Sequence, residues 1–132
     1  MIQPLSRDAP RPGRSRQVRS WRARSPKCRL CAVAATLTAA SFALPVGEVM
    51  ASSRGSPHAA FARQCAMYLA HVTFGLSHSE VARGFGRDRT TAAHACRLVE
   101  ERRDDAAVDA VLDTLERIGT ALHVSSGTPV QP

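Results

Sequence analysis

Residues 88–97 carry a run of polar side chains whose types could hydrogen-bond to nucleic-acid bases. Thr90, His94 and Arg97 recur at i, i+4 and i+7, a spacing that places side chains on one face of a helix. An arginine can donate two hydrogen bonds to guanine, a threonine can contact a thymine methyl group, and an aspartate can accept from the amine of cytosine. After Asp88 no acidic residue appears before position 100. The pattern therefore favours a surface that faces an anionic partner.

The helix that positions this surface is predicted to begin after Asp88, with Arg89, Thr90 and Thr91 in its first turn. Aspartate is a favoured N-cap residue, and its carboxylate suits the positive end of the helix dipole. The opposite face holds the apolar residues that we expect to be buried, namely Ala92, Ala95, Cys96 and Val99.

A short helix is predicted just before it, opening at Ser77. Ser77 and Glu80 have the spacing of a capping box, in which each side chain accepts from the other residue's backbone amide. Gly84 and Gly86 are expected to break this helix in a tight turn, because glycine adopts positive φ without steric cost. A short helix, a glycine-containing turn and a longer helix form a helix-turn-helix pattern. In that motif the second helix presents its first two turns to the major groove of DNA.

Two further helices should complete the domain, at residues 57–74 and 105–122. The first is predicted to begin at Pro57 and to stop at Gly75. Its apolar stripe comprises Phe61, Cys65, Tyr68, Leu69 and Val72, and its outer face comprises Arg63, Gln64, Met67 and His71. The stripe of the last helix comprises Val108, Val111, Leu112, Leu115, Ile118 and Leu122. No segment alternates at period two over a useful length, so the predicted fold class is all-α.

Three stretches of sequence resemble a known family. Residues 62–74 read ARQCAMYLAHVTF, residues 76–82 read LSHSEVA, and residues 85–101 read FGRDRTTAAHACRLVEE. They closely resemble the C-terminal DNA-binding domain of the bacterial replication initiator DnaA, which typically reads ARQ-x-A-M-Y-L, then Leu-Ser-x-x-Glu-Ile-Gly, then FGRDHTTVLHAC. The resemblance covers about residues 54–104. It implies a small Trp-repressor-like helical bundle that binds double-stranded DNA sequence-specifically, at sites similar to DnaA boxes.

The resemblance also implies roles for individual residues. Those expected to contact bases are Asp88, Arg89, Thr90 and Thr91. Those expected at or near the DNA backbone are Arg63, Gln64, Ser77, His78, His94 and Arg97. Arg54 lies near the position of a minor-groove contact. Arg89 stands where the family usually has histidine, so base preference there is expected to differ, and Ala92 replaces the usual valine with a small loss of packing.

Catalysis is not expected from this sequence. The full initiator has an ATPase module with a GxxxxGK[ST] phosphate loop, but this chain contains no such motif and its only lysine is Lys27. His71, His78 and His94 have no serine or cysteine at nucleophilic spacing, and no paired carboxylates mark a cleft. We therefore expect no enzyme, no cofactor, no small-molecule substrate and no membrane partner.

The four cysteines do not form a recognisable metal motif. Cys28 and Cys31 have half the spacing of a zinc site, but no second pair follows. Cys65 and Cys96 fall on predicted apolar faces, where buried thiols are common. No metal is expected.

Several functions remain open. A DNA-binding protein in the cytoplasm, at the nucleoid, could regulate replication by competing with the initiator at shared sites. The alternatives are a small helix-turn-helix transcription regulator and a helical interaction protein that does not bind DNA, with an acidic last helix docked on a partner. Salt should weaken DNA binding steeply, because phosphate contacts release counterions. The oligomeric state is left open.

The first 49 residues are expected to lie outside the domain, which is assigned to residues 54–122 with a tail at 123–132. Residues 1–30 hold nine basic residues and one acid, and the Arg-, Ser- and Pro-rich composition of residues 1–29 predicts disorder. An uncharged run follows from Leu30 to Gly47. It is interpreted as a signal or anchor segment, as a tail with an incidental apolar patch, or as the product of a start codon placed too early. Translation from Met50 is favoured, because the patterned sequence begins just after it.

The length and charge of the chain limit the class of protein that it can be. The chain has 132 residues and a formal net charge of +7, so a multi-domain enzyme is excluded on size. Residues 50–98 hold six arginines and two acids, whereas residues 99–132 hold three arginines and seven acids. The domain is therefore expected to have a basic part and an acidic last helix.

Overall fold

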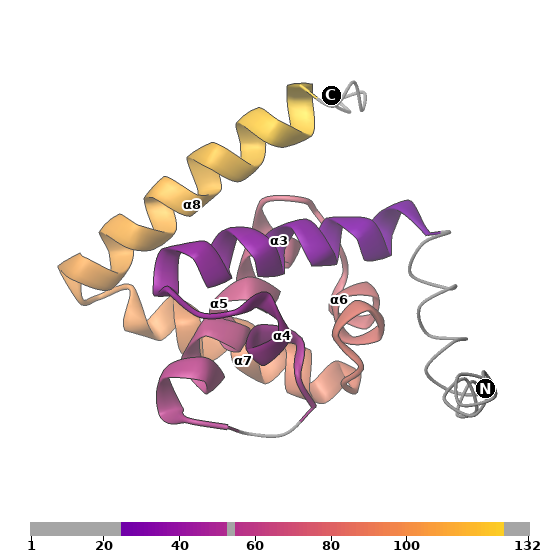
Figure 1. Ribbon diagram of the computed structural model, residues 1–132, viewed down its shortest axis with the longest axis horizontal. Helices are drawn as coiled ribbons and strands as arrows, with labels where there is room; N and C mark the ends of the chain where they lie inside the picture. The colour runs from indigo at the N-terminus through magenta and orange to yellow at the C-terminus, as the bar shows by residue number, and fades with distance from the viewer. Residues whose placement is uncertain (1–24, 53–54, 126–132) are drawn as a thin grey trace, which may run out of the picture.

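The computed structural model describes residues 25–52 and 55–125, and it builds them entirely from helices and connecting turns (Figure 1). The helices are α3 (Pro26–Phe42), α4 (Val46–Met50), α5 (Pro57–Val72), α6 (His78–Phe85), α7 (Arg89–Arg102) and α8 (Ala106–Ser125). These residues contain no strand, so the all-α class is confirmed.

Helix α5 lies at the centre of the bundle and packs against α3, α4, α6, α7 and α8. Its start is fixed by Ser56, whose hydroxyl accepts from the amide of Ala59 at 3.1 Å. The prediction of a polar outer face was wrong for Met67, which is 2% exposed, and for Arg63, which is also buried. Val72, predicted to face inward, is exposed. The reason is that neighbouring helices cover α5 on most sides.

Helix α3 corrects the largest error in the sequence-based interpretation. Residues 26–42, which were placed in an unstructured extension, form a helix that begins at the N-cap Ser25. It packs against α5 and α6, and its buried residues include Cys31, Ala34 and Ala35. Val49 of α4 is also fully buried. The helical unit therefore includes α3 and α4 and does not start at residue 54, while residues 1–24 lie outside the described part of the chain.

The uncharged run from Leu30 to Gly47 thus contributes one face of α3 to the protein core. Leu30, Val33 and Leu37 pack against the buried cluster from the side. None of the described helices is both long enough and apolar enough to cross a membrane.

Gly84 allows α3 and α6 to approach each other closely. A Cβ atom at this position would lie 2.3 Å from the sulfur of Cys31, a distance at which atoms clash. Gly84 is helical and buried, so the prediction that it helps break α6 was wrong. Gly86 alone makes the turn: its φ is 68°, and its amide donates to the carbonyls of Ala82 and Arg83.

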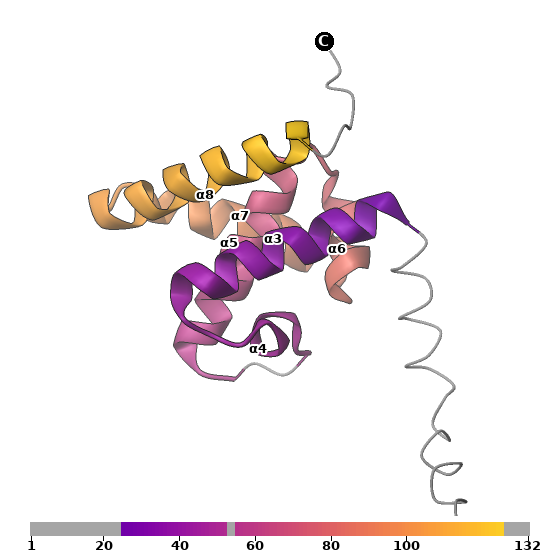
Figure 2. The same cartoon turned by 45° about the horizontal axis from the view of Figure 1, so that its top comes forward.

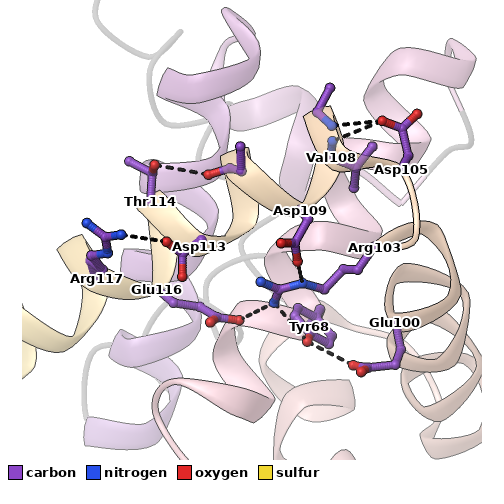
Figure 3. A network of polar contacts seen from close by, with 12 residues as sticks. Tyr68, Glu100, Arg103, Asp105, Val108, Asp109, Asp113, Thr114, Glu116 and Arg117 are labelled. Carbon is purple, nitrogen blue, oxygen red and sulfur yellow. Dashed lines mark hydrogen bonds and ion pairs between the residues drawn. The ribbon is translucent and has the colours of Figure 1, made fainter.

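A polar network sets the position of α8 (Figure 3). Arg103 donates from Nε to Asp109 at 2.6 Å and from Nη1 to Glu116 at 2.6 Å, and both acids lie on α8. The Arg103 Nη1 also lies 3.1 Å from the Tyr68 hydroxyl, which donates to Glu100 at 2.9 Å. Burial opposes the charge of Arg103, but its hydrogen bonds to Asp109, Tyr68 and Glu116 outweigh burial and raise its pKa.

Only part of the predicted α8 stripe reaches the core. Leu112 and Leu115 are buried, and Gly119 joins them by lying against Thr73 and Phe74 of the α5–α6 connection. Val111, Ile118 and Leu122 were also predicted to be buried, but they are exposed on the outer side of the helix. The helix extends to Ser125, so His123, which was assigned to the tail, is helical.

Candidate nucleic-acid interface

Helices α6 and α7 pack against each other and are joined by the turn at Gly86. The predicted capping box is confirmed, since the Ser77 hydroxyl accepts from the Glu80 amide at 3.1 Å and the Ser77 amide donates to Glu80 at 2.9 Å. Asp88 caps α7 by accepting from the amide of Thr91 at 2.9 Å. A short helix, a glycine turn and a second helix therefore lie in the order that the sequence predicted.

The first two turns of α7 present a polar face to solvent. Asp88, Arg89, Thr90, Thr91, His94 and Arg97 are all exposed. On the same helix, Ala92, Ala95, Cys96 and Val99 are buried, as predicted. The hydrogen bonds that Asp88 accepts from Thr91 lower the pKa of its carboxyl group, so this group stays ionised at the positive end of the helix. One of its oxygens, Oδ1, is used for capping.

An open groove of about 630 Å³ joins this face to the start of α5. Gln64 lines it from α5, while Thr91 and His94 line it from α7. Its remaining lining residues are Ser52, Gly55, Pro57, Ala60, Phe61, Arg63, Met67, Arg87, Ala95 and Arg102. The lining thus holds three arginines and a histidine but no acid, which suits an anion such as a phosphate group.

Arg63 does not extend into solvent from this groove as the sequence predicted. It is 6% exposed, and it donates from Nε to the Val49 carbonyl at 3.0 Å and from Nη2 to the Glu48 carbonyl at 2.9 Å. Burial first, and then the charge of Arg87, lowers its pKa. Its main visible role is to hold the last residues of α4 against α5.

Arg87 is a residue that the sequence-based reasoning missed. It donates to the Ser52 carbonyl at 2.9 Å and to the Ala51 carbonyl at 2.9 Å. Together with Arg63 it forms a carbonyl clamp, which we define as these two arginines on the four carbonyls of residues 48, 49, 51 and 52. No local signal could have revealed it, because Arg87 lies 35 and 36 residues from its partners along the chain. The clamp fixes the path of the chain up to Ser52, at the edge of the groove.

Arg54, predicted to lie near a minor-groove contact, falls outside the described residues. Ser52 and Gly55 line the groove on either side of it along the sequence.

Two histidines meet where α6 begins. The rings of His71 and His78 are stacked with their centroids 4.2 Å apart. Nδ1 of His71 lies 2.7 Å from the Leu76 carbonyl, so this nitrogen donates and carries a hydrogen. Burial, and then the neighbouring His71 and Arg89, lowers the pKa of His78. This environment therefore favours the neutral form of His78, next to the exposed Ser77.

The cysteines contribute to the core. All four are buried and free of disulfides, which confirms the prediction for Cys65 and Cys96. Burial raises the pKa of the Cys65 thiol to about 12 and that of Cys96 to about 11. Within residues 25–52 and 55–125, histidines, cysteines and acids form no group of three that could hold a metal ion.

The packing of α6 and α7 around Gly86, with an exposed polar start to the second helix, defines a helix-turn-helix protein. Residues 34–99 match the model of the bacterial dnaA protein helix-turn-helix, and the chain belongs to this family. The match begins inside α3, so it extends further toward the N-terminus than the resemblance seen in the sequence. Membership indicates a DNA-binding domain rather than a catalytic one. A comparison with curated proteins finds no match to the chain.

Proposed function

We propose that this protein binds double-stranded DNA sequence-specifically, at sites similar to DnaA boxes. The observation that carries the proposal is the exposed, acid-free face of α7 between Arg89 and Arg97, which stands beside a groove lined by three arginines. In a helix-turn-helix this part of the second helix enters the major groove. The capping bonds at Ser77 and Asp88 fix where the two helices begin, and α6 packs directly against α7.

Different side chains of the proposed interface would contact the bases and the backbone of DNA. Arg89, Thr90 and Thr91 would contact base edges, with the remaining carboxylate oxygen of Asp88 as an acceptor. The residues predicted to lie at the DNA backbone would act in two ways. Five of them would contact phosphates directly, namely Gln64, Ser77, His78, His94 and Arg97. Arg63 would instead act indirectly, through the carbonyl clamp.

The proposed role is regulation of replication initiation without ATP hydrolysis by this chain. Its sequence has no GxxxxGK[ST] loop, so occupancy of sites shared with the initiator is the mechanism that its residues support. Such a protein would act in the cytoplasm, on the nucleoid. A small transcription regulator is the second candidate, because a helix-turn-helix reads operators equally well.

A selection from random DNA duplexes with the full chain tests this proposal. Enrichment of a DnaA-box-like site would support a role in replication, and enrichment of an unrelated motif would support transcriptional regulation. A lack of any enriched sequence would reject sequence-specific binding and favour an interaction protein.

Arg89→Ala is expected to weaken binding to the selected site by about 1–3 kcal/mol and to relax preference at one base position. The physical reason is the loss of a two-donor contact to a base edge. Affinities for the selected site and for every single-base variant of it measure both effects. Arg29→Ala, which removes an exposed arginine from α3, is the control of equal charge. A uniform loss across all sequences would contradict a base-reading role for Arg89.

DNA binding is also expected to strengthen as the pH falls from about 8 to about 6. In the free protein the pKa of His78 is lowered, whereas a phosphate beside it would favour the charged ring and raise that pKa. The bound state then holds more protons, so the extra affinity is present at low pH and is lost as the pH rises through the bound-state pKa. His78→Gln should reduce this pH dependence, while His123→Gln on α8 should leave it unchanged. Equal pH dependence in wild type and His78→Gln would place His78 away from phosphate.

A further inference from the structure

Helix α8 exposes an uncharged stripe along its whole length. The stripe comprises Ala107, Val111, Thr114, Ile118, Ala121, Leu122 and Ser125. Apart from Leu122, its members alternate in steps of four and three residues, which is the heptad spacing of the seam between paired helices. Val111, Ile118 and Leu122 are 41%, 43% and 47% exposed. The charged residues Asp109, Asp113, Glu116 and Arg117 fall to one side, away from the centre of this stripe.

The stripe leads into an apolar pocket at the start of α8. This pocket has a volume of about 200 Å³. Its lining residues are Phe42, Phe61, Cys65, Ala107, Val108, Val111 and Leu112, all of which are apolar. Figures 1 and 2 show α8 along the outer side of the bundle, with no other described helix beyond it. One surface therefore carries a hollow near one end of the helix and an exposed leucine near the other.

We propose that a second copy of this chain docks on the stripe, with the two α8 helices antiparallel and centred at position 116, midway along the stripe. In a symmetric pair the same patch must fit itself, so a projection on one copy must meet a hollow on the other. Stripe positions equally far before and after 116 then face each other, namely 114 and 118, 111 and 121, and 107 and 125. Leu122 lies level with position 110 of the second copy, which is two residues, or about 3 Å, from Val108 and its pocket.

The size of the surface sets the expected strength. A helix of 20 residues is about 30 Å long, and it covers less than the roughly 800 Å² that each partner buries in a standard interface. We therefore expect a reversible dimer with a dissociation constant on the order of 10 µM. The dimer does not depend on DNA binding, so it can be tested on the protein alone.

Sedimentation equilibrium of the full chain, from about 1 µM to about 200 µM without DNA, is the first test. The wild type should pass from the mass of one chain to that of two. Leu122→Asp should weaken association at least about tenfold, because a charge would enter the apolar pocket. Thr120→Asp, on the charged side of the same helix, should leave it unchanged. A wild type that stays monomeric throughout, or equal effects of the two variants, would overturn the proposal.

Discussion

A chain that begins at Met50 is expected not to fold cooperatively. It would lack all of α3 and most of α4, which supply Cys31, Ala34, Ala35, Ala39 and Val49 to the core. A fully buried valine-sized side chain is worth about 1.5–3 kcal/mol, and each buried methyl-sized group about 0.8 kcal/mol. The facing surfaces of α5 and α6 would also be exposed to water. These losses are comparable with the whole stability of a small domain, about 5–15 kcal/mol.

Thermal and urea unfolding followed by circular dichroism would measure this effect. Residues 50–132 should retain some helix but show no sigmoidal transition, as expected when specific packing is lost. The control is residues 25–132, which keep every described helix and should unfold cooperatively. If residues 50–132 unfolded as sharply as this control, α3 would be an accessory element rather than part of the core.

Arg63→Met is expected to lower the free energy of unfolding by about 2–4 kcal/mol. Methionine keeps much of the length of the side chain but leaves the carbonyls of Glu48 and Val49 without their charged donor. These carbonyls lie at the end of α4, where no further helical turn can supply donors. Arg63→Lys should recover only part of the loss, because an ammonium group lacks the planar fork that reaches two acceptors.

The DNA affinity of Arg63→Met separates a structural role from a direct one. If Arg63 acts through the carbonyl clamp, stability and affinity should fall together, and affinity should fall nearly equally on all sequences. Arg83→Met removes an exposed arginine from α6 and is the control for stability. An affinity loss with unchanged stability would show instead that Arg63 meets DNA directly.

Features with local causes were predictable from the sequence. The capping box at Ser77, the N-cap at Asp88 and the buried face of α7 each depend on residues that lie three to seven positions apart. Their bonds form within one or two turns of a helix, so the order of residue types is enough to indicate them. The exposed polar face of α7 was predictable for the same reason, because its residues alternate with the buried ones along the same helix.

Features that depend on distant contacts were not predictable in this way. Alanine, threonine and serine occupy both sides of α3, so its faces differ little in polarity and show no apolar period. Its burial depends on Gly84, which is 53 residues away from Cys31 in the chain. Arg63 was interpreted as a surface cation because arginine is seldom buried without partners. Its partners are backbone carbonyls 14 and 15 residues away, and these cannot be recognised from side-chain types.

The carbonyl clamp has a consequence for how this segment can vary between related proteins. Arg63 and Arg87 bind main-chain oxygens, which every amino acid possesses, so the clamp does not depend on the identity of residues 48, 51 and 52. We expect these three positions to drift freely during evolution, apart from the demands of the short helix. The two arginines, in contrast, should be retained together or lost together. An alignment of relatives should therefore show two invariant arginines, together with variable residues at positions 48, 51 and 52.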